Sequence, residues 1–123
     1  MNPEIKAQWL AALRSGEYEQ GKMVLSNSGQ YCCLGVLCEL AFLAGGIVTK
    51  DSTGADVRYG TETGLLPFEV QKWAGLKESN PSVSINGELY AIAGVNDGTE
   101  LSDGSWLEAR TFSKIADLID AQL

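Results

Sequence analysis

The stretch CLGVLCELAFLA, residues 33–44, decides the fold, because Glu39 is its only charged residue. An apolar stripe at helical spacing runs along it and contains Leu34, Leu37, Cys38, Ala41 and Phe42. Most of its other positions are apolar too, which is typical of a helix buried on nearly all sides. Gly45 and Gly46 follow and are expected to end it. We therefore predict a central core helix over residues 33–44.

A first helix is predicted at the start of the chain. Asn2 is a good N-cap, Pro3 suits the first helical position, and Gly16 is expected to close the far end. The residues expected to face the core are Ile5, Trp9, Leu10 and Leu13.

Two helices are predicted in the second half of the chain. A short one covers residues 67–73 and is capped by Gly75, and the last begins at Phe112 after the N-cap Thr111. Their core residues are expected to be Phe68, Val70 and Trp73, and then Phe112, Ile115, Ala116 and Ile119.

Residues 82–92 carry the clearest hairpin signal. Apolar and polar residues alternate on both sides of Asn86-Gly87, which favours a type I′ turn because both central residues need positive φ. A weaker strand is predicted at Met23 to Leu25, with residues 30–32 as its partner, and another at residues 57–59. Residues 94–110, rich in Gly, Asp and Ser, are expected to form a long polar loop.

Helices, a hairpin and further helices in this order predict an α+β fold. We expect a small antiparallel sheet with the Asn-Gly hairpin, packed against about four helices. A chain of 123 residues without internal repeats or a linker predicts a single domain over residues 1–123.

The charge of the chain limits its chemistry. The formal net charge is −7 and there is no histidine, so a Ser-His or Cys-His nucleophile pair cannot form within one chain. An acidic protein repels nucleic acid phosphates, so DNA and RNA are not expected as partners. A small anion remains compatible, because one or two arginines can hold it.

The cysteines Cys32, Cys33 and Cys38 are odd in number, and the adjacent pair fits no common zinc spacing. With no recognisable signal peptide, they predict reduced, buried thiols in a cytoplasmic protein. No apolar run reaches about 18 residues, so neither a membrane span nor a membrane partner is expected.

The carboxylates within residues 100–108 share one loop, where a pair could act as acid and base. Acidic loop residues are usually just solvated, so no catalytic residue and no cofactor is assigned. Asp97 and Glu108 have the twelve-residue spacing of an EF-hand calcium loop. Leu101 and Ser102 stand where that loop needs an oxygen ligand and a glycine, so no metal site is predicted.

Arg110 lies beside the N-cap Thr111, where a cation opposes the helix dipole. Its position is explained if an anion also sits there, held by the guanidinium and by N–H groups of the first turn. The alternative is a salt bridge, to Asp97, Asp103 or Glu108. Trp106, in the same acidic region, is either an anchor folded onto the core or an aromatic platform for a ligand.

The segment YCCLGVLCELA, residues 31–41, resembles a widespread family of small phage and prophage proteins. The likeness continues in order through residues 12–16, 20–22, 66–67, 70–76, 96–97 and 112–119, and so covers nearly the whole chain. The chain is similar in this way to the Thoeris anti-defence sponge family. Members of that family bind and sequester a cyclic ADP-ribose signal made by bacterial TIR-domain immune proteins, without degrading it. They form dimers or larger assemblies.

The resemblance implies ligand-binding roles for Arg58, Asn96 and Arg110. Tyr90 is the aromatic residue nearest to the place where the family stacks a base. An arginine that the family uses at a second, cyclic-oligonucleotide site falls near residues 25–30, where this chain has none. With aromatic and polar neighbours added, the predicted site is Arg58, Tyr59, Tyr90, Asn96, Asp97, Trp106, Arg110 and Thr111.

Together these observations predict a phage protein of the host cytoplasm that sequesters a cyclic ADP-ribose isomer without cleaving it. We expect it to associate with itself as a dimer or a larger homo-oligomer. Two alternatives stay open, namely a protein–protein interaction module with an acidic contact loop and a hydrolase that uses carboxylates.

Overall fold

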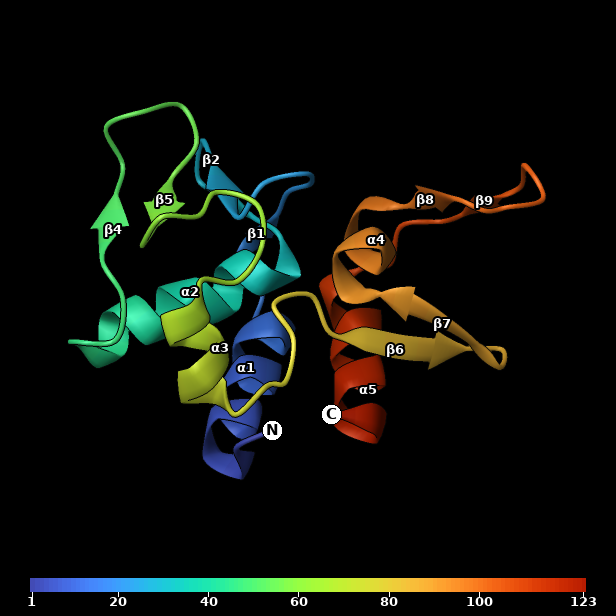
Figure 1. Cartoon of the computed structure of the whole chain (residues 1–123), viewed down its shortest axis with the longest axis horizontal. Coiled ribbons are helices and arrows are strands. Elements are labelled where there is room, and N and C mark those ends of the chain that lie inside the picture. The colour runs from blue at the N-terminus through green and yellow to red at the C-terminus, as the bar shows by residue number, and fades with distance from the viewer.

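The computed structural model describes all residues, 1–123, and it has an α+β fold (Figure 1). The helices are α1 (Pro3–Arg14), α2 (Cys33–Ala44), α3 (Phe68–Ala74), α4 (Ile92–Asp97) and α5 (Phe112–Gln122). The strands are β1 (Glu19–Gln20), β2 (Ser26–Asn27), β3 (Gln30–Tyr31), β4 (Lys50–Asp51), β5 (Arg58–Tyr59), β6 (Ser82–Ile85), β7 (Glu88–Ala91), β8 (Thr99–Glu100) and β9 (Trp106–Leu107). None of the helices has both the length and the apolar character needed to cross a membrane.

Helix α2 has the bounds predicted from its sequence and lies at the centre of the molecule. It packs against α1, α3 and α4, and most of its residues are buried. Cys32 is its N-cap, with Sγ accepting a hydrogen bond from the N–H of Gly35 at 3.4 Å. Phe42 is the exception to the predicted stripe, because its side chain is 39% exposed at the solvent side of the helix end.

The segment before α2 crosses the helix in direct backbone contact. The carbonyl of Leu25 lies against Gly35, and any side-chain carbon on Gly35 would overlap that oxygen. The predicted strand at Met23 to Leu25 is wrong, because Met23 has a φ of +75° and is exposed. The strand is instead β2, which pairs antiparallel with β3, while β1 pairs parallel with β3.

The two terminal helices pack side by side, with the caps that the sequence predicts. Asn2 Oδ1 accepts hydrogen bonds from the N–H groups of Glu4 and Ile5, and Thr111 Oγ1 accepts one from the first turn of α5. All eight predicted core residues of these helices are buried: Ile5, Trp9, Leu10, Leu13, Phe112, Ile115, Ala116 and Ile119. This pairing brings α5 and the hairpin after α3 to one side of the molecule (Figure 1).

The β6–β7 hairpin has the predicted register, and Asn86 and Gly87 take φ values of +53° and +85° in its turn. Ile92, predicted as the end of the hairpin, instead begins α4, and the rest of α4 and the β8–β9 ribbon lie in residues 94–110, which were predicted as a loop. The local sequence is polar and glycine-rich, but Ile92 and Val95 are buried and fix α4 against the core. In α3, Val70 is buried as predicted, whereas Phe68 is exposed.

We predict that Gly35→Ala destabilises the protein by about 3 kcal/mol, because the methyl group would force α2 away from the Leu25 carbonyl. The usual gain from alanine in a helix, about 1 kcal/mol, is too small to offset this. Urea unfolding followed by circular dichroism measures the loss. Gly64→Ala is the matched control, since Gly64 has open space and no positive φ, and it should cost nothing. Equal stability of the two variants would contradict the close contact between the Leu25 carbonyl and Gly35.

The thiols of Cys32, Cys33 and Cys38 are free and buried. Burial raises the pKa of all three, that of Cys32 to about 11, so almost no thiolate is present at neutral pH. We predict that a thiol-specific disulfide reagent labels none of them in the folded protein and all of them in denaturant. Rapid labelling of folded protein, or an internal disulfide found by mass spectrometry, would contradict this.

Candidate functional site

Arg110 lies at the start of α5 and is held there through its backbone. Its N–H donates to the carbonyl of Val95 at 2.9 Å, and its own carbonyl accepts from Gln20 Nε2 at 2.8 Å. The half-buried side chain donates to the backbone carbonyl of Glu108. No carboxylate lies within 4.0 Å of the guanidinium, so the salt bridge considered from the sequence does not form.

A hollow of about 290 Å³ opens beside Arg110, between α5 and the hairpin turn end of β6. Its lining residues are Ile85, Arg110, Lys114, Asp117 and Leu118. Arg110 precedes the N-cap of α5 and Lys114 lies in its first turn, and Asp117 is already bonded to Arg14 at 2.8 Å. In a protein of net charge −7, this hollow therefore offers two cations and an apolar wall to a small anion.

The first turn of α5 contributes less to this site than the sequence predicted. The N–H of Phe112 donates to Gln20 Oε1 at 3.0 Å, and the N–H of Lys114 donates to Thr111 Oγ1 at 3.4 Å. Those groups are therefore used within the protein, and an anion would be held mainly by side chains. Lys114 was missed by the sequence analysis. Arg110 lies before the N-cap of α5, so helical spacing alone does not predict that the two side chains line one hollow.

Asn96, predicted to bind ligand, lies fully buried at the junction of several segments. Its Oδ1 accepts from Gln20 Nε2 and from the N–H of Cys33, both at 3.1 Å. Its Nδ2 donates to the carbonyl of Gly21 at 2.9 Å and to Asp97 Oδ1 at 2.8 Å. All four hydrogen bonds of the amide are made, so Asn96 has nothing left to offer a ligand and positions the backbone instead.

Asp97 is also part of the framework, because its Oδ1 accepts from the N–H of Met23 at 3.1 Å. The twelve residues from Asp97 to Glu108 form the end of α4 and the β8–β9 ribbon, which is not the geometry of a calcium loop.

Arg58 and Tyr59, also predicted to bind ligand, belong to a different part of the molecule from Arg110 (Figure 1). Arg58 is exposed on β5. Tyr59 is buried, and its hydroxyl donates to Glu39 Oε1 at 2.8 Å, so its ring is not a surface on which a base could stack. The hydrogen bond and burial together raise the pKa of Tyr59, with burial the larger cause.

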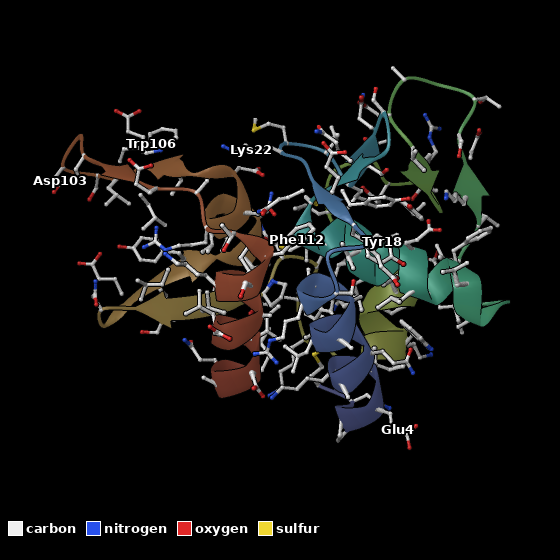
Figure 2. All side chains as sticks on the ribbon, turned by 180° about the vertical axis from the view of Figure 1, so that it is seen from behind. Glu4, Tyr18, Lys22, Asp103, Trp106 and Phe112 are labelled. Carbon is white, nitrogen blue, oxygen red and sulfur yellow. The ribbon has the colours of Figure 1, made fainter.

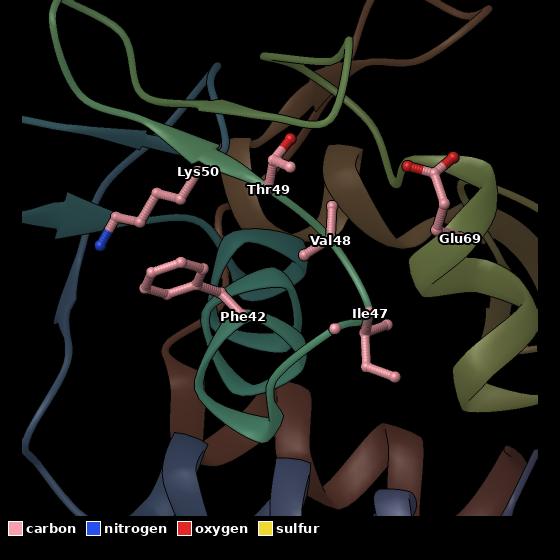
Figure 3. A pocket seen from close by; sticks show the side chains of 7 residues that line it. Phe42, Ile47, Val48, Thr49, Lys50 and Glu69 are labelled. Carbon is pink, nitrogen blue, oxygen red and sulfur yellow. The ribbon is translucent and has the colours of Figure 1, made fainter.

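The largest hollow, about 490 Å³, lies beside the C-terminal end of α2 and the segment that leads from it to β4 (Figure 3). Phe42, Ile47 and Val48 give it an apolar floor, and Lys50 and Glu69 contribute its charges. Lys50 Nζ lies 2.8 Å from Glu39 Oε1, and in Figure 3 it extends past the Phe42 ring, away from Glu69. Because its cation is already neutralised, this hollow is a weaker anion site than the one at Arg110.

Tyr90 and Trp106, the two aromatic candidates, lie on β7 and β9, which belong to different two-stranded sheets. The Tyr90 hydroxyl donates to Glu88 Oε2 at 2.8 Å, and this bond raises the pKa of Tyr90. Trp106 is 58% exposed on the β8–β9 ribbon (Figure 2), and its indole lies against Gly98, the residue that ends α4. Neither lines the hollow at Arg110, so a single chain does not bring an aromatic ring to that site.

Among known proteins, the chain has a match at the level of a protein family. No curated protein and no solved structure matches it. One family model matches, over residues 1–123, and its description is a domain of unknown function, DUF8296. Since that match covers the whole chain, the protein belongs to the DUF8296 family.

Proposed function

We propose that this protein sequesters a small phosphate-bearing nucleotide of the cyclic ADP-ribose type, and that it holds the phosphates at the hollow beside Arg110. The observation that carries the proposal is the Arg110 guanidinium, which has no carboxylate partner and lies next to Lys114. Each charge-assisted hydrogen bond to a phosphate contributes about 1.5–3 kcal/mol. The resemblance to phage anti-defence sponge proteins gives the class of ligand.

A binding role is favoured over a chemical one by the state of the nucleophiles. The three thiols are buried and their pKa values are raised, so they are protonated and shielded from any ligand in the Arg110 hollow. A sequestering protein needs charge and shape complementarity, and it needs no general base. The ligand would leave the protein chemically unchanged.

The size of the hollow supports self-association. At about 290 Å³ it lies at the small end of ligand sites, which span roughly 300–1,000 Å³. It would accept a pyrophosphate and part of a ribose while leaving the base outside. A second copy of the chain is one way to cover that base and to supply the missing aromatic ring, which agrees with the homo-oligomer predicted from the resemblance.

We predict that Arg110→Ala weakens binding of a cyclic ADP-ribose isomer by about a hundredfold, because two bonds of this kind to one pyrophosphate are lost. Lys114→Ala should weaken it by about tenfold, since the ammonium is a point charge. Calorimetric titration measures both, and the parent protein should melt at higher temperature with ligand present. Lys72→Ala, which removes an exposed cation from α3, is the matched control.

The fold should survive Arg110→Ala, because the guanidinium makes only one hydrogen bond, to the Glu108 carbonyl. Intact ligand recovered after heat denaturation would separate sequestration from hydrolysis. Failure of the parent protein to bind any cyclic ADP-ribose isomer would overturn the proposal. Loss of binding in Arg58→Ala would show that the site is shared between copies, since Arg58 and Arg110 belong to distant parts of one chain (Figure 1).

We predict a dimer or a larger assembly at micromolar concentration, with the associated fraction rising when ligand is added. The physical reason is that a ligand contacting two copies stabilises the associated state by mass action. Sedimentation equilibrium checks this. A species of 13.2 kDa alone, with and without ligand, would show that one chain forms the whole site.

A further inference from the structure

The two edges of the β6–β7 hairpin differ in whether another part of the chain covers their backbone groups. The β6 edge is covered by α5, where Gln122 Oε1 accepts from the N–H of Ser84 at 2.6 Å and Gln122 Nε2 donates to the Ser84 carbonyl at 2.8 Å. These bonds show that the backbone of Ser84 points away from β7. Ser84 therefore occupies a non-hydrogen-bonded position of the ladder.

The β7 edge is open. Leu89 is the register partner of Ser84, so its N–H and C=O point away from β6, toward the opposite edge. Neither group bonds to a turn, a loop or a side chain, and Leu89 is 74% exposed. A groove of about 340 Å³ runs beside this edge, between β7 and the β8–β9 ribbon. An unpaired strand edge of this kind is a template for an added strand.

The groove is negatively charged. Glu88 and Glu100 line it, and Asp103 lies at the tip of the β8–β9 ribbon above it (Figure 2). None of these carboxylates forms a salt bridge, because the three ion pairs of the protein involve only Asp117, Asp120 and Glu39. A bound segment with lysine or arginine side chains would therefore meet two carboxylates, Glu88 and Glu100, that no cation of the protein neutralises.

We propose that the β7 edge docks an extended, lysine- or arginine-rich segment of a partner protein, which adds to the hairpin as a third strand. Main-chain hydrogen bonds to Leu89 would supply affinity, and Glu88 and Glu100 would select the positive charge. A second copy of this chain fits the groove less well, because it would bring the same carboxylates against themselves. The docking edge is separate from the Arg110 hollow, which lies on the β6 and α5 side of the hairpin.

The probe is a fluorescent peptide of alternating lysine and valine, and anisotropy measures its binding to the full chain. Leu89→Pro removes the outward N–H without breaking the β6–β7 ladder, which is where an edge strand tolerates proline. We expect it to weaken binding at least tenfold. A peptide methylated on its backbone nitrogens should bind equally poorly to the parent protein, and this measurement does not depend on how the variant folds.

The charge is tested by Glu88→Gln combined with Glu100→Gln, which should also weaken binding about tenfold, equivalent to about 1.4 kcal/mol. Glu88→Gln keeps an oxygen that can accept from Tyr90. The matched control is Glu17→Gln, which removes an exposed carboxylate from the loop after α1 and should change nothing. Arg110→Ala should bind the peptide normally, so failure of the nucleotide site and failure of the docking edge are distinguishable.

Three results would overturn the proposal. Equal binding of the methylated and unmethylated peptides would show that only charge attracts them and that no strand is added. Absence of peptide binding to the parent protein would show that the carboxylates merely keep the edge from pairing with itself. A dimer that dissociates on Leu89→Pro would assign the edge to a second copy.

Discussion

The structure depends most on two hydrogen-bonded amides, the half-buried Gln20 and the buried Asn96, which join four segments that are distant in sequence. Asn96 holds the start of α2 and the Gly21 turn, and Gln20 holds the carbonyl of Arg110 and the N–H of Phe112. Each buried group left unpaired would cost about 1–3 kcal/mol, so the network is stable only when it is complete. Gln20 and Asn96 therefore fix the position of Arg110, the cation of the candidate site, although neither needs to contact a ligand.

A second constraint is the lone carboxylate of α2. Glu39 is nearly buried, and a buried charge is stable only when it is paired and hydrogen-bonded. Lys50 and Tyr59 satisfy it, and both come from the β4–β5 ribbon. The charge thus attaches that ribbon to the central helix. This requirement also explains why Tyr59, which has the chemistry of a ligand-stacking residue, is used inside the protein.

The β6–β7 hairpin separates two surfaces of opposite character. On the β6 side, Arg110 and Lys114 line one hollow, and on the β7 side, Glu88 and Glu100 line another. Charges interact over about 8–10 Å at physiological salt, so each surface acts mainly on what lies directly against it. An acidic protein of this size can therefore accept an anion at one side of a hairpin and a cationic segment at the other.

The sequence by itself determined the elements whose signals are local. The bounds of α2, the caps of α1 and α5 and the type I′ turn at Asn86-Gly87 follow from apolar spacing and capping chemistry within a few residues. Residues 94–110 read as a loop because nothing local shows that Ile92 and Val95 pack against the core. Arg110 was found from its place before a helix. The tertiary structure alone decided four other features, because each depends on contacts between segments that are distant in sequence. They are the burial of Asn96, the burial of Tyr59, the hollow that Arg110 and Lys114 line together, and the open edge at Leu89.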